Sequence, residues 1–370
     1  MAEQLKHFFG ERVVRGIAAD LRRAHARLDE AAFVRECLAG LGDLELTARG
    51  RHVAEVMGRH LPPRFPDAAR VLVASLGPEL VSSETFGMEP FRYLPHVVYV
   101  ASRGLDDFEA AMAAQLELTK RFTAEFSIRA FLTRYPAATL ERLRVWARDP
   151  NVHVRRLVSE GTRPRLPWAP RLRAFQEDPE PVIALLEMLR DDPERYVQRS
   201  VANNLNDISK DHPARAAALC AAWLADPTPG RRWIAGHALR SLVKQGHPAA
   251  LATLGFAARP KVAVAGARIT PAKVDIGDAV RFAFTLASRA KQTQRLVVDF
   301  AVHFVKANGA TRPKVFKLRA LDLAAGADVE CAGSVSLAAM TTRKHYPGVH
   351  RIDALINGVA YPLGEFTVRP

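Results

Sequence analysis

The chain has 370 residues, of which 48% are hydrophobic and 25% are charged, a balance typical of globular proteins that argues against a disordered or fibrous chain. Its length predicts two domains, because single hydrophobic cores rarely grow that large. Three scattered cysteines indicate neither a disulfide framework nor a zinc site, and the lack of a signal core or of about 20 successive apolar residues predicts a cytoplasmic protein without a membrane segment.

The net charge of +14 is unevenly distributed along the chain. Residues 1–120 hold 15 Lys and Arg against 17 Asp and Glu, residues 121–260 hold 22 against 14, and residues 261–370 hold 16 against 8. In the middle segment 20 of the 22 are arginines, whose planar guanidinium suits phosphate oxygens. A GC-rich genome would explain arginine in place of lysine but not the uneven excess. The distribution favours an acidic polymer, nucleic acid above all, as the partner.

Residues 5–254 have the pattern of successive helices. Apolar residues recur at three- and four-residue spacing, and Pro and Gly separate the segments. The clearest helices are predicted at residues 33–41, 105–135, 140–147, 181–189 and 214–224. No convincing strand interrupts this region, so the first two thirds of the chain are predicted to be all-helical.

An Asp-Pro step precedes a helix three times, at Asp149, Asp192 and Asp226. An Asp N-cap followed by proline in the first turn is a typical helix start, because the missing proline N–H costs nothing there. The steps lie 43 and 34 residues apart, the size of a HEAT-type helix pair, and such pairs stack into a solenoid with a concave binding face. Chance similarity of capped helices is the alternative, since the three copies are degenerate.

After Lys261 the pattern changes to alternating apolar residues, which predicts strands at residues 280–286 and 296–304. Asn308-Gly309 and Asn357-Gly358 predict hairpin turns. About 110 residues of short strands indicate a β-sandwich of immunoglobulin-like size. We therefore expect a HEAT-like repeat domain at residues 1–258 and a β-sandwich domain at residues 259–370.

Three acidic residues could line one surface of the repeat domain, each from a successive helix. Residues four apart share a helix face, and this spacing gives three stripes: Arg121, Glu125 and Arg129; Arg156 and Glu160; and Arg199, Asn203 and Asp207. Gly161 would end the second helix and leave Glu160 beside the loop that contains Trp168. One carboxylate per repeat would then lie on the concave face.

For each stripe the alternative is an exposed face whose Glu–Arg pairs only increase solubility, and spacing alone favours that interpretation. Trp168 and Trp233 are either core residues or aromatic surfaces for a nucleotide. The histidines lack metal-ligand spacing, and no Walker, GxGxxG or GxSxG motif occurs. Metal, nucleotide and acyl-transfer chemistry therefore have no support in the sequence.

Five segments carry a resemblance to a known family. They are LKHFFGE from Leu5, EFSIRAFL from Glu125, VHVRRLVSEGTRPRLPW from Val152, YVQRSVANNLNDISKDHP from Tyr196, and VHFVKANG from Val302 with the KVFKL that follows it. Over nearly its whole length the chain resembles the AlkC-type alkylpurine DNA glycosylases, which are relatives of the AlkD type with HEAT-like repeats.

The resemblance implies a monomeric DNA repair glycosylase that releases N3-methyladenine and 3-methylcytosine from duplex DNA without a metal or organic cofactor. Carried over by position, Glu125, Glu160 and Asp207 would be catalytic and Trp168 would stand at the lesion. The repeat domain would bend the duplex, and the immunoglobulin-like domain would grip it. The expected DNA- and lesion-binding residues are Trp168, Arg129, Arg155, Arg156, Arg163, Arg165, Arg199, Asn203, Trp233 and Lys306.

The residues fit leaving groups that are already cationic. An N3-alkylated adenine needs no general acid, whereas carboxylates can stabilise the oxocarbenium-like sugar and position the attacking water. Asp207 is expected to position the water, because Asn203 on the same stripe could orient it. The main alternative is a non-catalytic HEAT scaffold whose basic face binds nucleic acid or an acidic protein, and the third is an enzyme acting on RNA or a free nucleoside.

Overall fold

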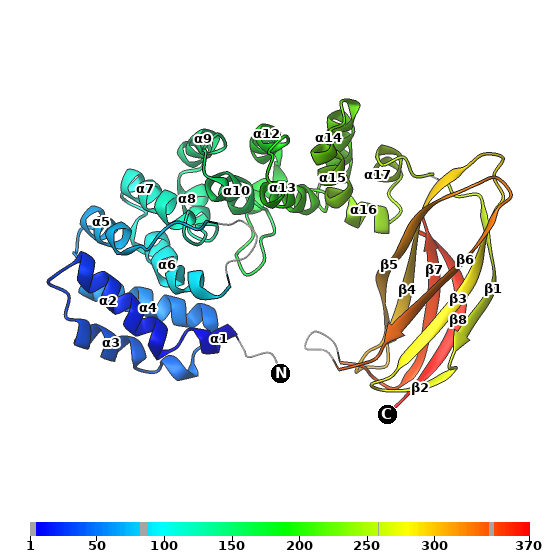
Figure 1. Ribbon diagram of the computed structural model, residues 1–370, viewed down its shortest axis with the longest axis horizontal. Coiled ribbons are helices and arrows are strands. Elements are labelled where there is room, and N and C mark those ends of the chain that lie inside the picture. The colour runs from blue at the N-terminus through cyan, green and yellow to red at the C-terminus, as the bar shows by residue number, and fades with distance from the viewer. Residues whose placement is uncertain (1–4, 82–86, 258, 340–343) are drawn as a thin grey trace. The chain divides into compact units, whose positions relative to one another are not determined.

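The computed structural model describes residues 5–81, 87–257, 259–339 and 344–370. Helices occupy the first part of the chain and strands occupy the second part (Figure 1), which confirms the predicted mainly helical fold followed by a β-sandwich. The backbone divides into two compact units, residues 1–211 with 228–237, and residues 212–227 with 238–370. The division into domains at residues 1–258 and 259–370 stays a prediction.

The first unit is all-helical in its described residues. It contains two short 3-10 turns, η1 (Leu41–Asp43) and η2 (Glu89–Tyr93). Its α-helices are α1 (Leu5–Phe8), α2 (Glu11–Ala24), α3 (Glu30–Leu38), α4 (Leu46–His60), α5 (Phe65–Ser75), α6 (Leu94–Arg103), α7 (Phe108–Thr119), α8 (Ile128–Arg134), α9 (Pro136–Trp146), α10 (Val152–Gly161), α11 (Arg173–Glu177), α12 (Glu180–Leu189), α13 (Arg195–Ile208) and α15 (Pro229–Ala238). The unit includes α15 as far as His237.

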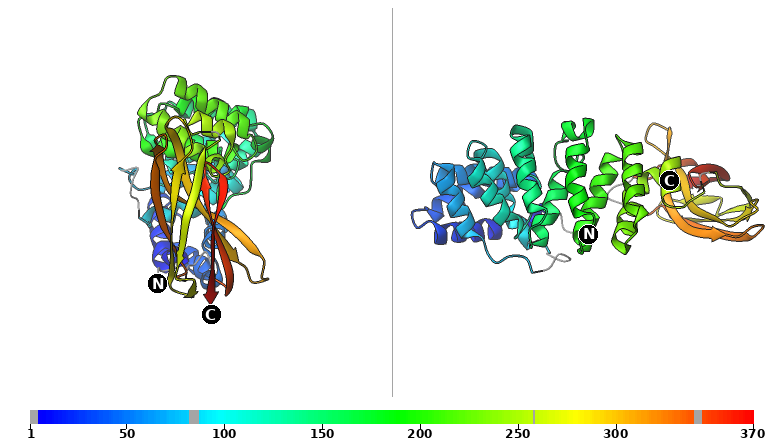
Figure 2. Two further views of the ribbon diagram at one scale, coloured as in Figure 1. Left: turned by 90° about the vertical axis from the view of Figure 1, so that its right-hand side faces the viewer. Right: turned by 90° about the horizontal axis from the view of Figure 1, so that it is seen from above.

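These helices pack in two layers, as a stack of helix pairs does. In one layer α5 contacts α7 and α9 contacts α12, and in the other α4 contacts α6 and α10 contacts α13 (Figures 1 and 2). The layers are held together by contacts of α8 with α9 and of α10 with α12. The layer of α8, α10 and α13 carries the predicted catalytic region.

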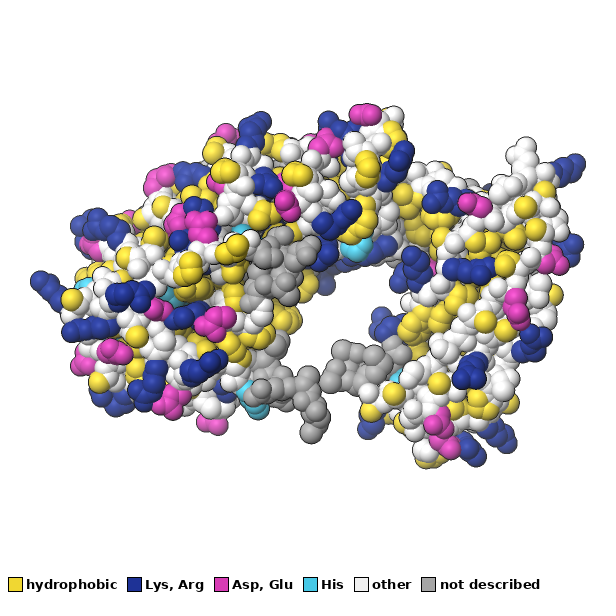
Figure 3. All heavy atoms as spheres, in the orientation of Figure 1, with side chains coloured by type: hydrophobic (Ala, Val, Ile, Leu, Met, Phe, Trp, Pro, Cys, Tyr) yellow, Lys and Arg dark blue, Asp and Glu magenta, His cyan; other side chains and the backbone are white. Residues whose placement is uncertain are grey.

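Each of the helices α10 and α13 buries an apolar stripe. Val154, Leu157 and Val158 of α10 are fully buried, and Val197 and Leu205 of α13 are buried in the same way. On the face of this unit shown in Figure 3, Lys and Arg side chains alternate with Asp and Glu side chains. That face therefore carries charges of both signs.

One predicted helix is wrong in its extent. Residues 105–135 form two helices, α7 and α8, separated by a non-helical segment at residues 120–127. Hydroxyl groups in that segment form local hydrogen bonds that compete with the helix: Thr123 Oγ1 accepts from Glu125 N at 3.2 Å, and Ser127 Oγ donates to Ala124 O at 3.1 Å. Glu125 therefore lies in a connection between helices, and it does not share a helical stripe with Arg121 and Arg129.

Other predicted helix ends moved by a few residues. The helix expected at residues 33–41 is α3 (Glu30–Leu38), which stops before Gly40 in a left-handed conformation with φ of 72°. The helix expected at residues 140–147 begins earlier, as α9, whereas residues 181–189 and 214–224 match α12 and α14 (Pro213–Ala225) closely.

Two of the three Asp-Pro steps, at Asp149 and Asp192, start helices by a different mechanism from the one expected. The N-cap of α10 is Asn151 and that of α13 is Glu194. Asp149 and Asp192 instead accept hydrogen bonds from the backbone N–H two residues later, at 2.8 and 2.9 Å, which is an Asx turn around the proline. Asp178 makes the same turn before α12, a step that the sequence analysis missed.

The second unit contains a β-sandwich, with α14, α16 (Arg240–Lys244) and α17 (Pro248–Thr253). Its strands are β1 (Val262–Thr270), β2 (Lys273–Asp275), β3 (Ala279–Ser288), β4 (Gln294–Val305), β5 (Thr311–Leu323), β6 (Asp328–Ser336), β7 (Gly348–Ile356) and β8 (Val359–Arg369). One sheet has the order β1-β3-β6 and the other β2-β8-β7-β4-β5. All pairs are antiparallel except β2 with β8.

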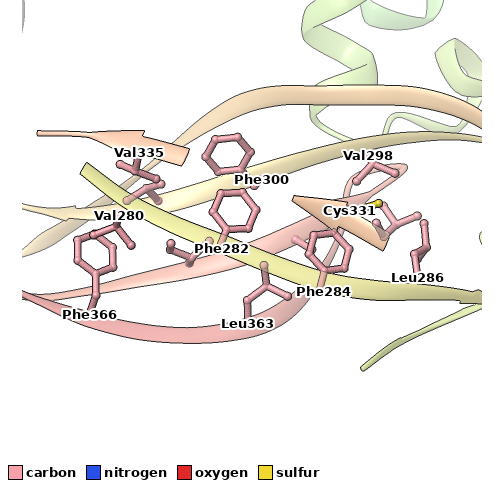
Figure 4. Close-up of a cluster of buried hydrophobic side chains, with 14 of the residues drawn as sticks. Val280, Phe282, Phe284, Leu286, Val298, Phe300, Cys331, Val335, Leu363 and Phe366 are labelled. Carbon is pink, nitrogen blue, oxygen red and sulfur yellow. The ribbon is translucent and has the colours of Figure 1, made fainter. Parts of the chain in front are cut away.

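The core of the sandwich lies between the two sheets. Alternate residues of β3, among them Phe282 and Phe284, meet β4 residues such as Phe300 (Figure 4), and the rings of Phe282 and Phe300 are 4.7 Å apart. Both predicted hairpin turns are confirmed. Gly309 joins β4 to β5 with φ of 78°, and Asn357-Gly358 joins β7 to β8 with φ of 48° and 83°.

Candidate active site

Glu125 is tied to α10 through an arginine. Arg156 Nη1 donates to Glu125 Oε2 and, at 3.1 Å, to Thr123 Oγ1. The same oxygen of Glu125 accepts from Thr123 Oγ1 at 2.9 Å. No partner within the described ranges binds Glu125 Oε1. The side chain of Glu125 is 12% exposed, so this carboxylate keeps one oxygen open for a further ligand.

Glu160 is buried at the end of α10 and is nevertheless held as an anion. Its Oε1 accepts from Arg163 Nη1 at 2.7 Å and lies 3.5 Å from Arg156 Nη2, and its Oε2 accepts from Ser200 Oγ at 2.6 Å. Burial alone would raise the pKa of Glu160, but Arg156, Arg163 and the Ser200 hydroxyl together hold that pKa below its ordinary value. Glu160 is therefore ionised at neutral pH.

Asp207 lies near the end of α13, and its side chain is only 3% exposed. Its Oδ2 accepts from Arg163 Nε at 2.9 Å, and its Oδ1 accepts from Lys210 Nζ at 2.9 Å. The orienting partners of Asp207 thus include two cations that the stripe pattern did not indicate. Lys210, three residues after Asp207, was accessible to spacing arguments, whereas Ser200 and the loop residue Arg163 were not.

The three carboxylates form one continuous network with three cations. It runs Glu125, Arg156, Glu160, Arg163, Asp207 and Lys210, with each cation beside a carboxylate. Each arginine bridges two carboxylates, because Arg156 touches Glu125 and Glu160 while Arg163 touches Glu160 and Asp207. The structure therefore brings together the three predicted carboxylates from the α7–α8 connection, α10 and α13, and fixes their orientation.

Trp168 is the most exposed aromatic part of this region. Its side chain is 70% exposed, and its backbone has φ of 63°, a left-handed conformation that is uncommon for a bulky residue. The alternative that Trp168 is a core residue is wrong. It lies in the α10–α11 connection, which also holds Arg163 and therefore links the carboxylate network to an exposed aromatic surface.

Trp233 and Asn203 lie on facing helices. The Trp233 ring stacks on His237 at 4.9 Å, and the Arg195 guanidinium lies 4.3 Å from the ring centroid. Asn203 Oδ1 is 3.2 Å from His237 Nε2. Trp233 is half-buried, so part of its ring is already covered by protein groups.

Most of the arginines predicted to bind DNA have partners within the protein. Arg155 donates to Asp192 at 2.6 Å, and Arg165 donates to Asp211 at 3.1 Å. Arg156 and Arg163 belong to the carboxylate network, and Arg129 is buried with 5% exposure. The binding of DNA by these five arginines therefore stays a prediction. The residues hold acidic side chains and backbone of neighbouring repeats.

Other basic residues are exposed. Arg199 on α13 and Lys306 in the β4–β5 turn, both predicted, are exposed. Arg171 and Arg173, which follow Trp168 closely in the chain, are also exposed, and nothing in the described parts of the chain pairs with their side chains. Arg171 and Arg173 were not predicted from the sequence, because no stripe contains them. Their position directly after the loop was the available signal.

Among the described residues no group of three His, Cys, Asp or Glu side chains is placed to hold a metal ion. None of the described helices combines the length and apolar character needed to cross a membrane.

Comparison with known proteins gives matches to both parts of the chain. Residues 119–244 match the family model described as DNA alkylation repair enzyme, and residues 263–370 match the C-terminal Ig-like domain of the uncharacterised protein YhaZ. The chain is 32% identical to YhaZ of Bacillus subtilis, over 98% of this chain and 99% of that protein. It is 40% identical to the alkylpurine DNA glycosylase AlkC of Pseudomonas fluorescens, solved bound to DNA containing an abasic site analogue, over 100% of both chains with a TM-score of 0.91.

The chain belongs to the AlkC family of alkylpurine DNA glycosylases. The family model of the repair enzymes covers Glu125, Glu160 and Asp207, and hence the whole carboxylate network. In this AlkC-family chain the first matched segment lies within the helical region, from the end of α7 to α16, and the second spans the immunoglobulin-like sandwich. The resemblance stated from the sequence is thus confirmed at the level of family and fold.

Proposed function

We propose that this chain hydrolyses the N-glycosidic bond of cationic alkylated bases, N3-methyladenine and 3-methylcytosine, in duplex DNA, as a monomer without a metal or organic cofactor. The observation that supports the proposal is the network in which Glu125, Glu160 and Asp207 are held as a fixed set by Arg156, Arg163 and Lys210. Family membership supports the reaction class.

The chemistry required is stabilisation of positive charge on the sugar. A cationic base leaves as a neutral molecule, so no acid has to protonate it, and the barrier lies in the electron-poor sugar that remains. Ionised carboxylates fixed in advance lower that barrier without reorganising. Glu160, whose pKa is held below its ordinary value, supplies negative charge of this kind at neutral pH.

One carboxylate also has to position the attacking water. Asp207 is the residue expected from the sequence, and Arg163 and Lys210 fix its orientation. Glu125 is the second candidate, because its Oε1 has no partner in the described part of the molecule. The two assignments make opposite predictions about which substitution, Asp207→Asn or Glu125→Gln, lowers the excision rate further.

DNA binding is assigned to the exposed basic residues and to Trp168. Arg171, Arg173, Arg199 and Lys306 are exposed, and arginine and lysine side chains contact phosphates readily. Trp168 offers an exposed aromatic face to the damaged nucleotide. Trp233 and Asn203, which are half-buried, are assigned to positions beside the lesion, where they would support its binding.

The test is release of bases from methylated duplex DNA, analysed by chromatography. We expect N3-methyladenine and 3-methylcytosine to appear above the spontaneous rate, and neutral hypoxanthine in a parallel duplex to stay bound to its sugar. The control is the same duplex without protein. A protein that binds the duplex but releases no alkylated base would be a HEAT scaffold and would contradict the proposal. Equal release of hypoxanthine would contradict the role given to the cationic leaving group.

A further inference from the structure

Arg129 is a buried cation without a carboxylate partner. It lies on α8 and is 5% exposed. Its Nη1 donates to Gly161 O at 3.2 Å and to Arg163 O at 2.8 Å, and its Nη2 donates to Pro170 O. One guanidinium therefore joins both ends of the connection that leaves α10 at Gly161 and reaches Pro170. Arg129 thus closes this connection into a loop, which we call the Trp168 loop (residues 162–170).

The Trp168 loop carries two groups on which the proposed function depends. Arg163, near its start, bridges Glu160 and Asp207 at 2.7 and 2.9 Å. Trp168, near its end, is 70% exposed with a left-handed backbone. Such a backbone conformation persists only where its surroundings impose it. The contacts of Arg129 with Gly161, Arg163 and Pro170 lie on both sides of Trp168, where they can impose it.

Burying the positive charge of Arg129 costs free energy, so its contacts require an explanation. Burial and the neighbouring Arg163 lower the pKa of Arg129 to about 10, although Glu125 and Asp207 partly offset the effect. Arg129 Nε is buried, and no acceptor for it is found among the described residues. A buried charge is costly unless hydrogen bonds compensate it, and here the compensating hydrogen bonds go to the Trp168 loop and to Gly161 directly before it.

We propose that Arg129 is a positioning residue that sets the place of Trp168 and Arg163 by holding the two ends of the Trp168 loop together. The inference rests on the proposed function, since it assigns Trp168 to the lesion and Arg163 to the carboxylates. It replaces the expectation that Arg129 binds DNA directly.

The chain offers a matched control in Arg49. Arg49, on α4, is also buried, with 6% exposure. It likewise donates to backbone carbonyls, those of Lys6 at 2.8 Å, Phe9 at 2.9 Å and Leu44 at 2.7 Å. It belongs to the N-terminal helices and touches neither the carboxylate network nor the Trp168 loop. Arg49→Met therefore removes the same kind of buried guanidinium at a place without a proposed function.

The experiment compares Arg129→Met, Arg129→Lys and Arg49→Met with the wild type. The protein is labelled with 5-fluorotryptophan, and its four tryptophans are followed by 19F NMR without DNA, with Trp168→Phe used to assign the Trp168 resonance. The rate of N3-methyladenine release in a single turnover, the affinity for undamaged duplex and the Tm are measured on the same samples. Arg129→Lys retains a cation and serves if Arg129→Met does not fold.

We expect Arg129→Met to shift or broaden the Trp168 resonance and to leave the resonances of Trp146 and Trp223 in place. The single-turnover rate should fall about 10- to 100-fold, because small misplacements of positioning groups cost rates of that order. Affinity for undamaged duplex should change less than about threefold, since exposed cations carry that binding. Arg129→Lys should recover part of both signals. Arg49→Met should keep the wild-type Trp168 resonance and rate, even at a similar loss in Tm.

Two outcomes would overturn the inference. In one, Arg129→Met retains the wild-type Trp168 resonance and rate. In the other, Arg49→Met lowers the rate as much as Arg129→Met at a similar Tm, which would make the effect one of general stability. Failure of the proposed function can be distinguished from failure of this inference. If the proposed function is wrong, the wild type itself releases no base, while the 19F spectra still report on the Trp168 loop.

Discussion

Glu160 and Asp207 of the network are buried together with the cations that compensate their charge. Glu160 is the clearest case, because Arg156, Arg163 and Ser200 all act on one carboxyl group that is 8% exposed. Taking an ion out of water costs several kcal/mol, and its partners return that cost only while the group is ionised. The partners that would hold Glu160 ionised for catalysis therefore also make the stability of the fold depend on the charge of Glu160.

This dependence predicts how pH changes the effect of Glu160→Gln on stability. Since the pKa of Glu160 in the folded protein lies below its ordinary value, the ionised carboxylate contributes stability above the unfolded pKa of about 4.3, and this contribution is lost as pH falls through the folded pKa. We expect Glu160→Gln to lower the free energy of unfolding by about 3 kcal/mol at pH 7. The deficit should shrink as the pH is lowered below about 5.

Denaturant unfolding at several pH values measures this difference. Glu187→Gln is the control, because Glu187 forms an ordinary ion pair with Arg190 at 2.7 Å and is 35% exposed; its effect should stay within about 1 kcal/mol at neutral pH. A deficit for Glu160→Gln that grows on acidification would show that the carboxyl group is not held as an anion.

At the scale of elements, close approach of α8 and α10 brings Glu125 and Glu160 near one another. An added Cβ on Gly161 would lie 2.5 Å from Ile128 Cγ2, so only glycine allows this spacing. Gly161 was predicted from the sequence to end a helix. The helix does end there, but the packing role of Gly161 depends on a helix that begins 33 residues earlier, at Ile128, and no local pattern reveals such a contact.

We expect Gly161→Ala to destabilise the protein by about 1–2 kcal/mol, because the overlap with Ile128 outweighs the gain in helix propensity. Adding Ile128→Leu removes the β-branch that the new methyl group would meet and should restore part of the loss. Gly236→Ala is the control, since a methyl group there meets nothing within 4 Å, and it should stabilise α15. Thermal unfolding measures all three variants against the wild type. A neutral Gly161→Ala would contradict the close packing of α8 on α10.

The elements also show what the sequence could and could not predict. Periodicity predicted α12 and α14, and Asn-Gly pairs predicted both β-hairpin turns, because these features depend on local residues. The break between α7 and α8 was missed because the apolar period continues through residues 120–127, while hydroxyl groups of Thr123 and Ser127 hold the backbone out of the helix. The stripe of Arg121, Glu125 and Arg129 was therefore wrong, although Glu125 still reaches the network through Arg156.

At the scale of the whole molecule, the number of basic residues in excess does not give the number of cations that are exposed to a partner. Residues 121–260 hold 22 basic against 14 acidic residues, yet Arg155, Arg156, Arg163 and Arg165 are engaged in ion pairs. The count predicted the sign of the partner's charge. It could not predict which arginines are exposed, because pairing between repeats depends on tertiary structure.

We expect the exposed arginines to carry the salt dependence of DNA binding. Each phosphate contact contributes about −0.9 to the slope of the logarithm of affinity against the logarithm of salt concentration. Replacing Arg171, Arg173 and Arg199 together by alanine should make the slope shallower by about 0.9 for each contact that is lost. Arg15→Ala, which removes an exposed arginine from the acidic first segment, should leave the slope unchanged. Fluorescence anisotropy at several salt concentrations measures it, and an unchanged slope in the triple variant would contradict the assignment.

The central claim is that the carboxylate network performs the excision. The most direct measurement is the single-turnover rate of N3-methyladenine release by Asp207→Asn, with affinity for a duplex containing an abasic site analogue measured in parallel to show that the variant still binds DNA. We expect the rate to fall about 100-fold or more, as it does when one preorganised electrostatic group is removed from an active site, and Glu125→Gln to lower the rate by less. A rate within twofold of the wild type for Asp207→Asn would contradict the account.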